Sequence, residues 1–277
     1  MTFPISSKAS ELLARAAGTK PVLGIDTGTP IAALGLVVDG RIAGSILRPV
    51  TSHGASLPAA VGELLHASAL TARDLGAIAV AIGPGSFTGL RISLSYAKGL
   101  AMASGCALIG MGSLDALAVA ALDSPAAREG TLVCALVDAR RGEVYAALYR
   151  IVSDGLKKLS EDLVVSLEHL TSRIEDDVPG NVILVGDSRA KDAAALLSSR
   201  GLGVAVLDIC SLDSRGGLLA AIGAARLSRG EVDNPASLEP LYLRPAAAAL
   251  NSGRSAQAAS RTEDLWSDER KNSSGSI

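Results

Sequence analysis

The stretch Val22-Leu23-Gly24-Ile25-Asp26-Thr27-Gly28-Thr29 sets the pattern of the fold. It is a short apolar run that ends in an acid and passes into a turn-rich segment, which is typical of a buried strand. A second apolar run follows at 31–38, Asp39-Gly40 is a strong hairpin signal, and a third strand is predicted at 41–47. We therefore expect the chain to open with three strands.

The same order recurs in the second half. A strand predicted at 131–137 ends at Asp138, a strand at 143–152 leads to the hairpin signal Asp154-Gly155, and a third strand is predicted at 156–165. Each set of strands is followed by alternating segments. These are helices at 53–67, 86–104, 113–122, 167–174, 190–199 and 217–228, and strands at 75–82, 106–110, 182–185 and 204–207. Two copies of one α/β unit account for the length.

The repeat divides the chain into parts. We expect an N-terminal domain at 21–112 and a C-terminal domain at 113–245, preceded by a mobile extension at 1–20. Residues 246–277 are rich in Ser, Ala, Gly and charge without periodicity, so a disordered tail is predicted there.

The composition restricts the classes of fold and function that the chain can have. Of 277 residues, 48% are hydrophobic and only 3% aromatic, which favours tight α/β layers built from small aliphatic side chains. The formal net charge of -2 is too neutral to hold a nucleic acid by the field of this chain alone, so a nucleic-acid role is expected to need a partner. No apolar run approaches the ~18 residues that cross a bilayer, and we expect a cytoplasmic protein without membrane contact.

The glycine-rich segment Gly83-Pro84-Gly85-Ser86-Phe87-Thr88-Gly89 lies between a predicted strand and a predicted helix. Its glycines and the helix N-terminus suit an anion-binding turn, and they equally suit a tight corner that binds nothing. The helix that follows is apolar or small almost all round. Either a second helical surface packs on it or a thick domain buries it.

Asp26 and Asp138 end equivalent strands, a placement that in duplicated α/β ATPases could hold hydrated Mg²⁺ beside phosphates. The loop after Asp26 is small enough to approach phosphate, whereas Arg140 and Arg141 make the second loop bulky and cationic. An ATP cleft needs both loops open. The two arginines therefore form either a solvated turn or a contact for an anion or a partner.

No catalytic or metal group can be assembled from the sequence. The histidines His53, His66 and His169 lack the spacing of a metal pair, and the three cysteines are far apart and outside any CxxC pattern. No nucleophile with an activating base stands out.

Five segments carry a resemblance to a known family. They are Ile25-Asp26-Thr27, residues 79–92 around the glycine-rich turn, residues 97–101, the stretch 137–145 that begins Val-Asp-Ala-Arg-Arg-Gly, and Pro240-Leu241-Tyr242-Leu243-Arg244. In this order they resemble the TsaB (YeaZ) family. The resemblance implies an α/β, duplicated ribonuclease-H-like fold with two similar domains, of the type of actin, sugar kinases and chaperone ATPases.

The resemblance also implies a function. TsaB-like proteins are non-catalytic dimerisation subunits that support TsaD in forming N6-threonylcarbamoyladenosine next to the anticodon of tRNAs reading ANN codons. It implies a TsaD-type partner, a TsaE-type ATPase in the larger assembly, a homodimer when alone, and tRNA contacted mainly through the complex. No cofactor of this chain is expected, and a nucleotide at the partner interface is left open.

Residues are assigned by the same resemblance, which places partner docking on helices 53–67 and 86–104. The interface residues are Leu57, Val61, Leu64, Leu65, Phe87, Leu90, Arg91, Leu94, Ala97, Lys98 and Ala101. A vestigial phosphate or nucleotide site is assigned to Asp26, Thr27, Gly28, Thr29, Gly83, Gly85, Ser86, Asp138, Arg140 and Arg141. The alternative function is an active small-molecule kinase or ATPase, which calorimetry with Mg-ATP would detect.

Overall fold

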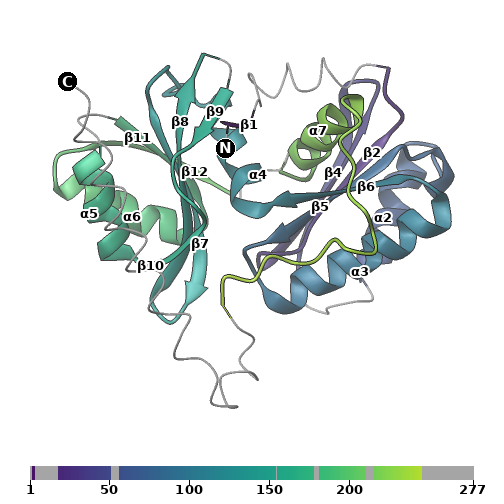
Figure 1. Ribbon diagram of the computed structural model, residues 1–277, viewed down its shortest axis with the longest axis horizontal. Helices are drawn as coiled ribbons and strands as arrows, with labels where there is room; N and C mark the ends of the chain where they lie inside the picture. The colour runs from purple at the N-terminus through teal and green to yellow at the C-terminus, as the bar shows by residue number, and fades with distance from the viewer. Residues whose placement is uncertain are drawn as a thin grey trace. The chain divides into compact units, whose positions relative to one another are not determined.

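The computed structural model describes residues 2–3, 18–50, 56–153, 155–177, 181–209 and 215–244 (Figure 1). Outside these ranges lie most of the predicted extension and tail, the predicted helix start with His53, and Cys210. Among the described helices, none has the length and apolar character needed to cross a membrane.

The first sheet has the strand order β4-β3-β2-β5-β6. Its strands are β2 (Val22–Asp26), β3 (Ile31–Val38), β4 (Arg41–Pro49), β5 (Ala77–Gly83) and β6 (Ala107–Gly112). The β2, β3 and β4 strands pair antiparallel, whereas β5 is parallel to both β2 and β6.

The second sheet repeats this order as β9-β8-β7-β11-β12, with antiparallel pairs among the first three strands and parallel pairs among the last three. Its strands are β7 (Leu132–Arg140), β8 (Glu143–Val152), β9 (Gly155–Lys158), β11 (Asn181–Gly186) and β12 (Gly203–Asp208). Additional short strands are β1 (Thr2–Phe3), which pairs with β9, and β10 (Leu163–Ser166), which pairs with β8. The predicted duplicated ribonuclease-H-like fold is confirmed.

One predicted strand is wrong. The segment 156–165 forms two strands, β9 and β10, because the chain leaves the ladder between them. There Leu159 N donates to Leu148 O at 2.8 Å and Leu148 N donates to Ser160 Oγ at 3.0 Å. The break brings Asp162 to Lys158, with 2.6 Å between Oδ1 and Nζ.

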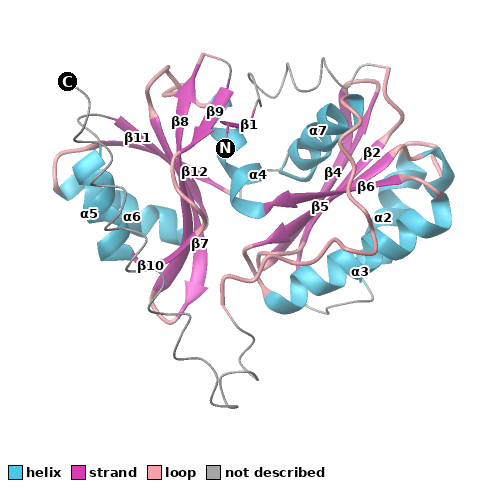
Figure 2. Cartoon of the chain, in the orientation of Figure 1, coloured by secondary structure: helices cyan, strands magenta, loops and turns pink. Residues whose placement is uncertain are grey.

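Helices cover both faces of each sheet (Figure 2). On the first sheet, α2 (Ser56–Ala67) and α3 (Phe87–Ser104) pack on one face and α7 (Arg215–Ser228) packs on the other. On the second sheet, α5 (Leu167–Asp177) and α6 (Ser188–Ser199) lie on one face and α4 (Ser113–Val119) packs on the other. The 3₁₀ helices η1 (Ala72–Asp74) and η2 (Ala120–Asp123) complete the described elements.

Helix α7 packs across the predicted division at residue 112. α7 falls in the predicted C-terminal domain but lies on the first sheet, where glycines let the backbones touch. A Cβ on Gly35 would lie 2.0 Å from Gly217 N, and one on Gly24 would lie 2.3 Å from Gly216 O. The division into 21–112 and 113–245 stays a prediction, and α7 crosses it.

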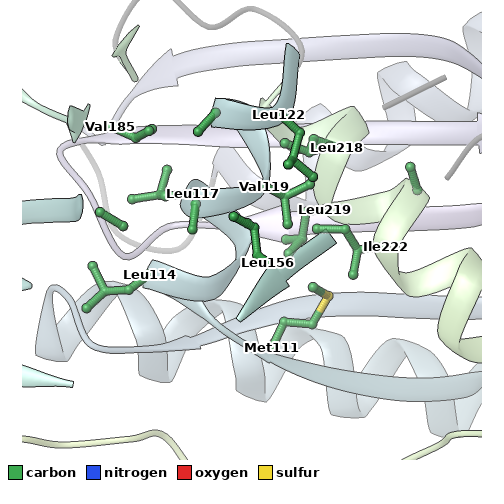
Figure 3. Packing of buried hydrophobic residues seen from close by; sticks show 14 of the residues in the cluster. Met111, Leu114, Leu117, Val119, Leu122, Leu156, Val185, Leu218, Leu219 and Ile222 are labelled. Atoms are coloured by element: carbon green, nitrogen blue, oxygen red, sulfur yellow. The ribbon is translucent and has the colours of Figure 1, made fainter. Parts of the chain in front are cut away.

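A core cluster joins α4, α7 and strands of both sheets (Figure 3). Leu114 and Leu117 of α4, and Leu219 and Ile222 of α7, are buried in it together with Val185 of β11. Burial of this shared apolar surface holds the two sheets together.

A part-buried group of charged and polar side chains fastens α4 to the second sheet. Asp115 in α4 accepts hydrogen bonds from Tyr149 Oη at 2.7 Å and from Lys158 Nζ at 2.8 Å. Burial raises the pKa of Tyr149 well above its ordinary value, and the charge of Asp115 adds to the shift. Burial acts to lower the pKa of Lys158, but its two carboxylate partners raise it overall. The group therefore ties α4 to the second sheet through paired charges.

Candidate functional site

The glycine-rich segment forms the corner between β5 and α3. The Gly83-Pro84 peptide bond is cis, and the chain turns into α3 with Ser86 as its N-cap. Ser86 Oγ accepts a hydrogen bond from Gly89 N at 3.3 Å. One of the helix N–H groups proposed for an anion is thus satisfied within the chain.

This corner packs directly against the loop after β2. Ser86 N donates to Gly28 O at 2.7 Å, and Thr27 Oγ1 donates to Gly89 O at 2.7 Å. A Cβ on Gly85 would lie 2.6 Å from Gly28 O, and one on Gly89 would lie 2.0 Å from Thr27 O. The glycines are therefore required for contact between two loops, and this geometry favours the interpretation of the motif as a tight corner.

The carboxylate of Asp26 forms an ion pair with Arg215 of the same chain. The Asp26 side chain is 10% exposed, Oδ1 accepts a hydrogen bond from Gly28 N at 2.8 Å, and Oδ2 lies 3.5 Å from Arg215 Nε. Arg215, from the first turn of α7, also donates from Nη2 to Thr29 Oγ1 at 3.2 Å and to the Ile31 carbonyl. The predicted phosphate loop is thereby tied to α7.

Sequence reasoning missed Arg215. It stands at the far end of the described chain, and the only local signal is an arginine before Gly216-Gly217 at the start of an apolar helix. Buried polar atoms without a hydrogen-bond partner in the described part of the chain include Nε and Nη1 of Arg215 and the Oγ of Ser113, near Gly28.

The second loop, at the turn from β7 to β8, has a different character. Asp138 N donates to Asp187 Oδ2 at 2.9 Å, and Asp138 Oδ1 accepts from Arg140 N at 3.1 Å. Arg140 and Arg141 are exposed. Asp138 therefore stabilises the local backbone of the turn through these hydrogen bonds, and the two arginine side chains lie in solvent.

Most residues assigned to the partner interface are core residues of the chain itself. Their side chains face the first sheet, because each lies on the apolar stripe of α2 or α3. Buried in this way are Leu57, Val61, Leu64, Leu65, Leu90, Leu94, Ala97 and Ala101. In the single chain they are therefore covered by the first sheet, and their assignment to a partner interface stays a prediction. Phe87 and Lys98 are half-buried, and exposed Arg91 places its guanidinium carbon 3.9 Å from the Phe87 ring centroid.

The opposite sides of the same two helices are exposed and carry mostly small residues. We call these residues the outer face: Ala59, Gly62 and His66 of α2, and Arg91, Ser95, Gly99 and Met102 of α3. A Cβ added at Gly62 or Gly99 would meet no atom within 4 Å. Met102 is 78% exposed, an unusual position for a large apolar side chain on a helix. Of the outer face, the sequence analysis assigned only Arg91 to the interface, because the helix pattern alone did not distinguish the two sides of each helix.

The described part of the chain contains no group of three His, Cys, Asp or Glu residues that could hold a metal ion. Cys134 is buried in the second sheet, and burial raises the pKa of its thiol to about 12. Cys106 is half-buried, and burial also raises its pKa. Neither thiol has the lowered pKa of a reactive cysteine.

Comparison with known proteins agrees with this architecture. The family model described as "TsaD: tRNA N6-adenosine threonylcarbamoyltransferase" matches residues 50–213. Two solved structures from Pseudomonas aeruginosa share the fold. An uncharacterized protein with similarity to peptidase YeaZ has a TM-score of 0.66 at 25% identity, and covers 82% of this chain and 100% of its own. YeaZ has a TM-score of 0.64 at 23% identity, and covers 81% of this chain and 100% of its own.

Sequence relatives narrow the class. The tRNA threonylcarbamoyladenosine biosynthesis protein TsaB of Escherichia coli is 32% identical over 165 residues, which cover 60% of this chain and 70% of TsaB. An uncharacterized protein of Mycobacterium tuberculosis is 34% identical over 226 residues, which cover 80% of this chain and 91% of the relative.

Fold and family model together define a duplicated ribonuclease-H-like protein that is related in sequence to the TsaD family. Relatives named for tRNA threonylcarbamoyladenosine biosynthesis come from Escherichia coli, Bacillus subtilis and Haemophilus influenzae. Within this class, the chain belongs to the TsaB (YeaZ) family.

Proposed function

We propose that this chain is a non-catalytic scaffolding subunit for a TsaD-type protein. In this role it supports formation of N6-threonylcarbamoyladenosine next to the anticodon of tRNAs that read ANN codons. It forms a homodimer when alone, and a TsaE-type ATPase joins the larger assembly. The tRNA is contacted mainly through the complex.

The outer face is the observation that carries this proposal. Ser95 and Gly99 recur one turn apart on α3, and side chains of this size let a second helix approach closely. Met102 on the same helix is 78% exposed and adds an adaptable apolar contact. Interface cores exclude water around such apolar anchors.

The conformation of the loop after β2 supports the proposal that this chain is not itself an enzyme. Asp26 is paired with Arg215, and the loop is filled by its contacts with Gly85 and Gly89. A catalytic phosphate site needs a carboxylate free to hold a metal ion and loops open to phosphate. Tight binding of Mg-ATP by the isolated chain would contradict the non-catalytic assignment.

Ser95→Asp tests the outer face. Ser95 is exposed, so the folded chain tolerates the change, while a charge at the centre of a helix–helix contact is costly. We expect Ser95→Asp to lose association with the TsaD-type subunit in gel filtration. The matched control is Ala195→Asp, an exposed position on α6, which should bind as the unaltered chain does.

Transfer of the threonylcarbamoyl group by the TsaD-type subunit gives the second readout. We expect the unaltered chain and Ala195→Asp to raise the transfer rate, and Ser95→Asp to leave it at the rate of the subunit alone. Equal rates with and without the unaltered chain would reject the proposed function. A Ser95→Asp chain that still co-purifies with the subunit would reject the outer face as its docking surface.

A further inference from the structure

The turn between β7 and β8 is a place where sequence and backbone conformation disagree. Arg140 and Arg141 have φ angles of 65° and 56°, and Gly142 follows with 81°. This left-handed conformation suits glycine, asparagine and aspartate, and it costs free energy for a long side chain. Two consecutive arginines nevertheless adopt it.

The same chain contains a hairpin turn that follows the rule. Asp39 and Gly40, with φ angles of 47° and 71°, connect the paired residues Val38 and Arg41. Asp-Gly is a preferred sequence for such a two-residue turn. Between β7 and β8, Arg141 stands where Asp39 stands in the first hairpin, since Arg140 pairs with Glu143 across the turn. Local strain of this kind is retained where the side chain serves another purpose.

Folding makes little use of the two arginine side chains. The Arg140 side chain is 81% exposed, and its Nε lies 3.7 Å from Asp138 Oδ2, a pair of little energetic value. Arg141 is exposed and takes part in no hydrogen bond or ion pair with the described residues. The backbone beneath them is braced, because Arg189 Nη2 donates to Gly142 O at 3.3 Å. A fixed turn thus presents two guanidinium groups to solvent.

We propose that Arg140 and Arg141 bind phosphate groups of the tRNA backbone, an inference that rests on the proposed function for the source of the RNA. Guanidinium groups match phosphate in charge and in the geometry of their donors. Because the net charge of the chain is -2, this contact is local and positions the RNA, while the partner supplies most of the affinity.

An acidic protein segment is the competing occupant, and the surroundings of the turn disfavour it. Protein contacts are centred on apolar side chains. The large apolar side chains exposed in the described part of the chain are Met102, Val232, Leu241 and Tyr242, none of them in the turn. A turn that presents two guanidinium groups and no exposed large apolar side chain is better suited to a phosphate backbone.

The double variant Arg140→Gly/Arg141→Asn separates the effect of the two charges on tRNA binding from any effect on folding stability. Both new residues suit the left-handed conformation, so we expect the melting temperature to stay unchanged or to rise by about 2–4 °C. The tRNA affinity of the complex with the TsaD-type subunit should fall about tenfold at about 0.15 M salt. The slope of log affinity against log salt should decrease by about 1.5–2, as expected for two lost phosphate contacts. The control is Arg41→Ala, which removes an exposed arginine beside the Asp39-Gly40 turn and should leave both values unchanged.

Each outcome decides the proposal. Unchanged affinity and salt slope in the double variant would overturn it. Loss of association with the TsaD-type subunit would assign the turn to a protein contact and would also overturn it. If the proposed function itself fails, the unaltered chain does not associate with that subunit. The same salt titration, carried out on the full chain alone with tRNA, then decides the role of the arginines.

Discussion

At the scale of single residues, Asp26 lies at the end of β2 almost enclosed, with Arg215 of α7 as its ion-pair partner. Two charges taken out of water contribute little net stability as a pair, but either one left alone in the interior is expensive. Arg215 also donates to Thr29 Oγ1 and the Ile31 carbonyl. The arginine therefore fixes the conformation of the loop that a phosphate site would need to open.

Arg215→Met tests this role. The substitution removes the guanidinium and keeps a side chain of similar length, so Asp26 is left buried without its partner. We expect the free energy of unfolding in urea to fall by about 3 kcal/mol. Adding Asp26→Asn should recover part of this loss, because no unpaired charge then remains. A neutral effect of Arg215→Met would show that the ion pair does not hold the loop.

The thiol of Cys134 makes stability depend on alkaline pH. Burial raises its pKa from 9.0 to about 12. The unfolded chain therefore releases this proton first, and the stabilisation that is complete below pH 9 is lost as the pH rises toward 12. Between pH 8 and pH 10.5 the loss from this one group is about 2 kcal/mol.

Cys134→Ala should reduce the fall in unfolding free energy between these two pH values by that amount. Urea denaturation of both chains at both pH values gives the difference, and the cost of the smaller side chain cancels within each variant. Burial also raises the pKa of Tyr149, so part of the alkaline fall should persist. The same fall in both chains would exclude Cys134 as its source.

At the scale of elements, the sequence predicts where helices and strands lie better than which side of them is used. The apolar spacing correctly located α3, predicted at 86–104 and observed at Phe87–Ser104. It did not reveal that Leu94 faces the sheet while its neighbour Ser95 faces outward, because half-buried Ile92, Tyr96 and Leu100 blur the stripe. Orientation depends on which sheet the helix packs against, and that is set by strands far away in the chain.

The glycines of α3 show the same distinction between its two sides. A Cβ on Gly89 would lie 2.0 Å from Thr27 O, whereas Gly99 has open space around it. We expect Gly89→Ala to lower the free energy of unfolding by about 2 kcal/mol, because the loops must separate. Gly99→Ala should raise it by about 0.5–1 kcal/mol through helix propensity. Thermal denaturation at low protein concentration measures both without interference from association, and equal effects would contradict the contact between the loops.

At the scale of the whole molecule, the repeated order of acid, turn, strand and hairpin signal revealed the duplication, because each of these signals is local and occurs in both copies. The pairing of Asp26 with Arg215 and the packing of α7 on the first sheet were missed. Both join segments from opposite ends of the chain, and no local pattern records such contacts. The shared core of α4, α7 and both sheets is likewise a product of tertiary structure.

This shared core predicts that the two sheets unfold together. Ile222 of α7 is 2% exposed and lies in the cluster that spans both sheets, so Ile222→Ala should weaken both. Hydrogen exchange is expected to show a loss of about 3 kcal/mol for the amides of β2 and for those of β7. Ile174→Ala provides a comparison, because Ile174 is fully buried in a cluster formed by the second half alone. If the two halves unfold cooperatively, this variant also lowers the protection of the β2 amides from exchange. Loss of protection in β2 alone after Ile222→Ala would mean that the halves unfold independently, and that α7 stabilises only the sheet on which it packs.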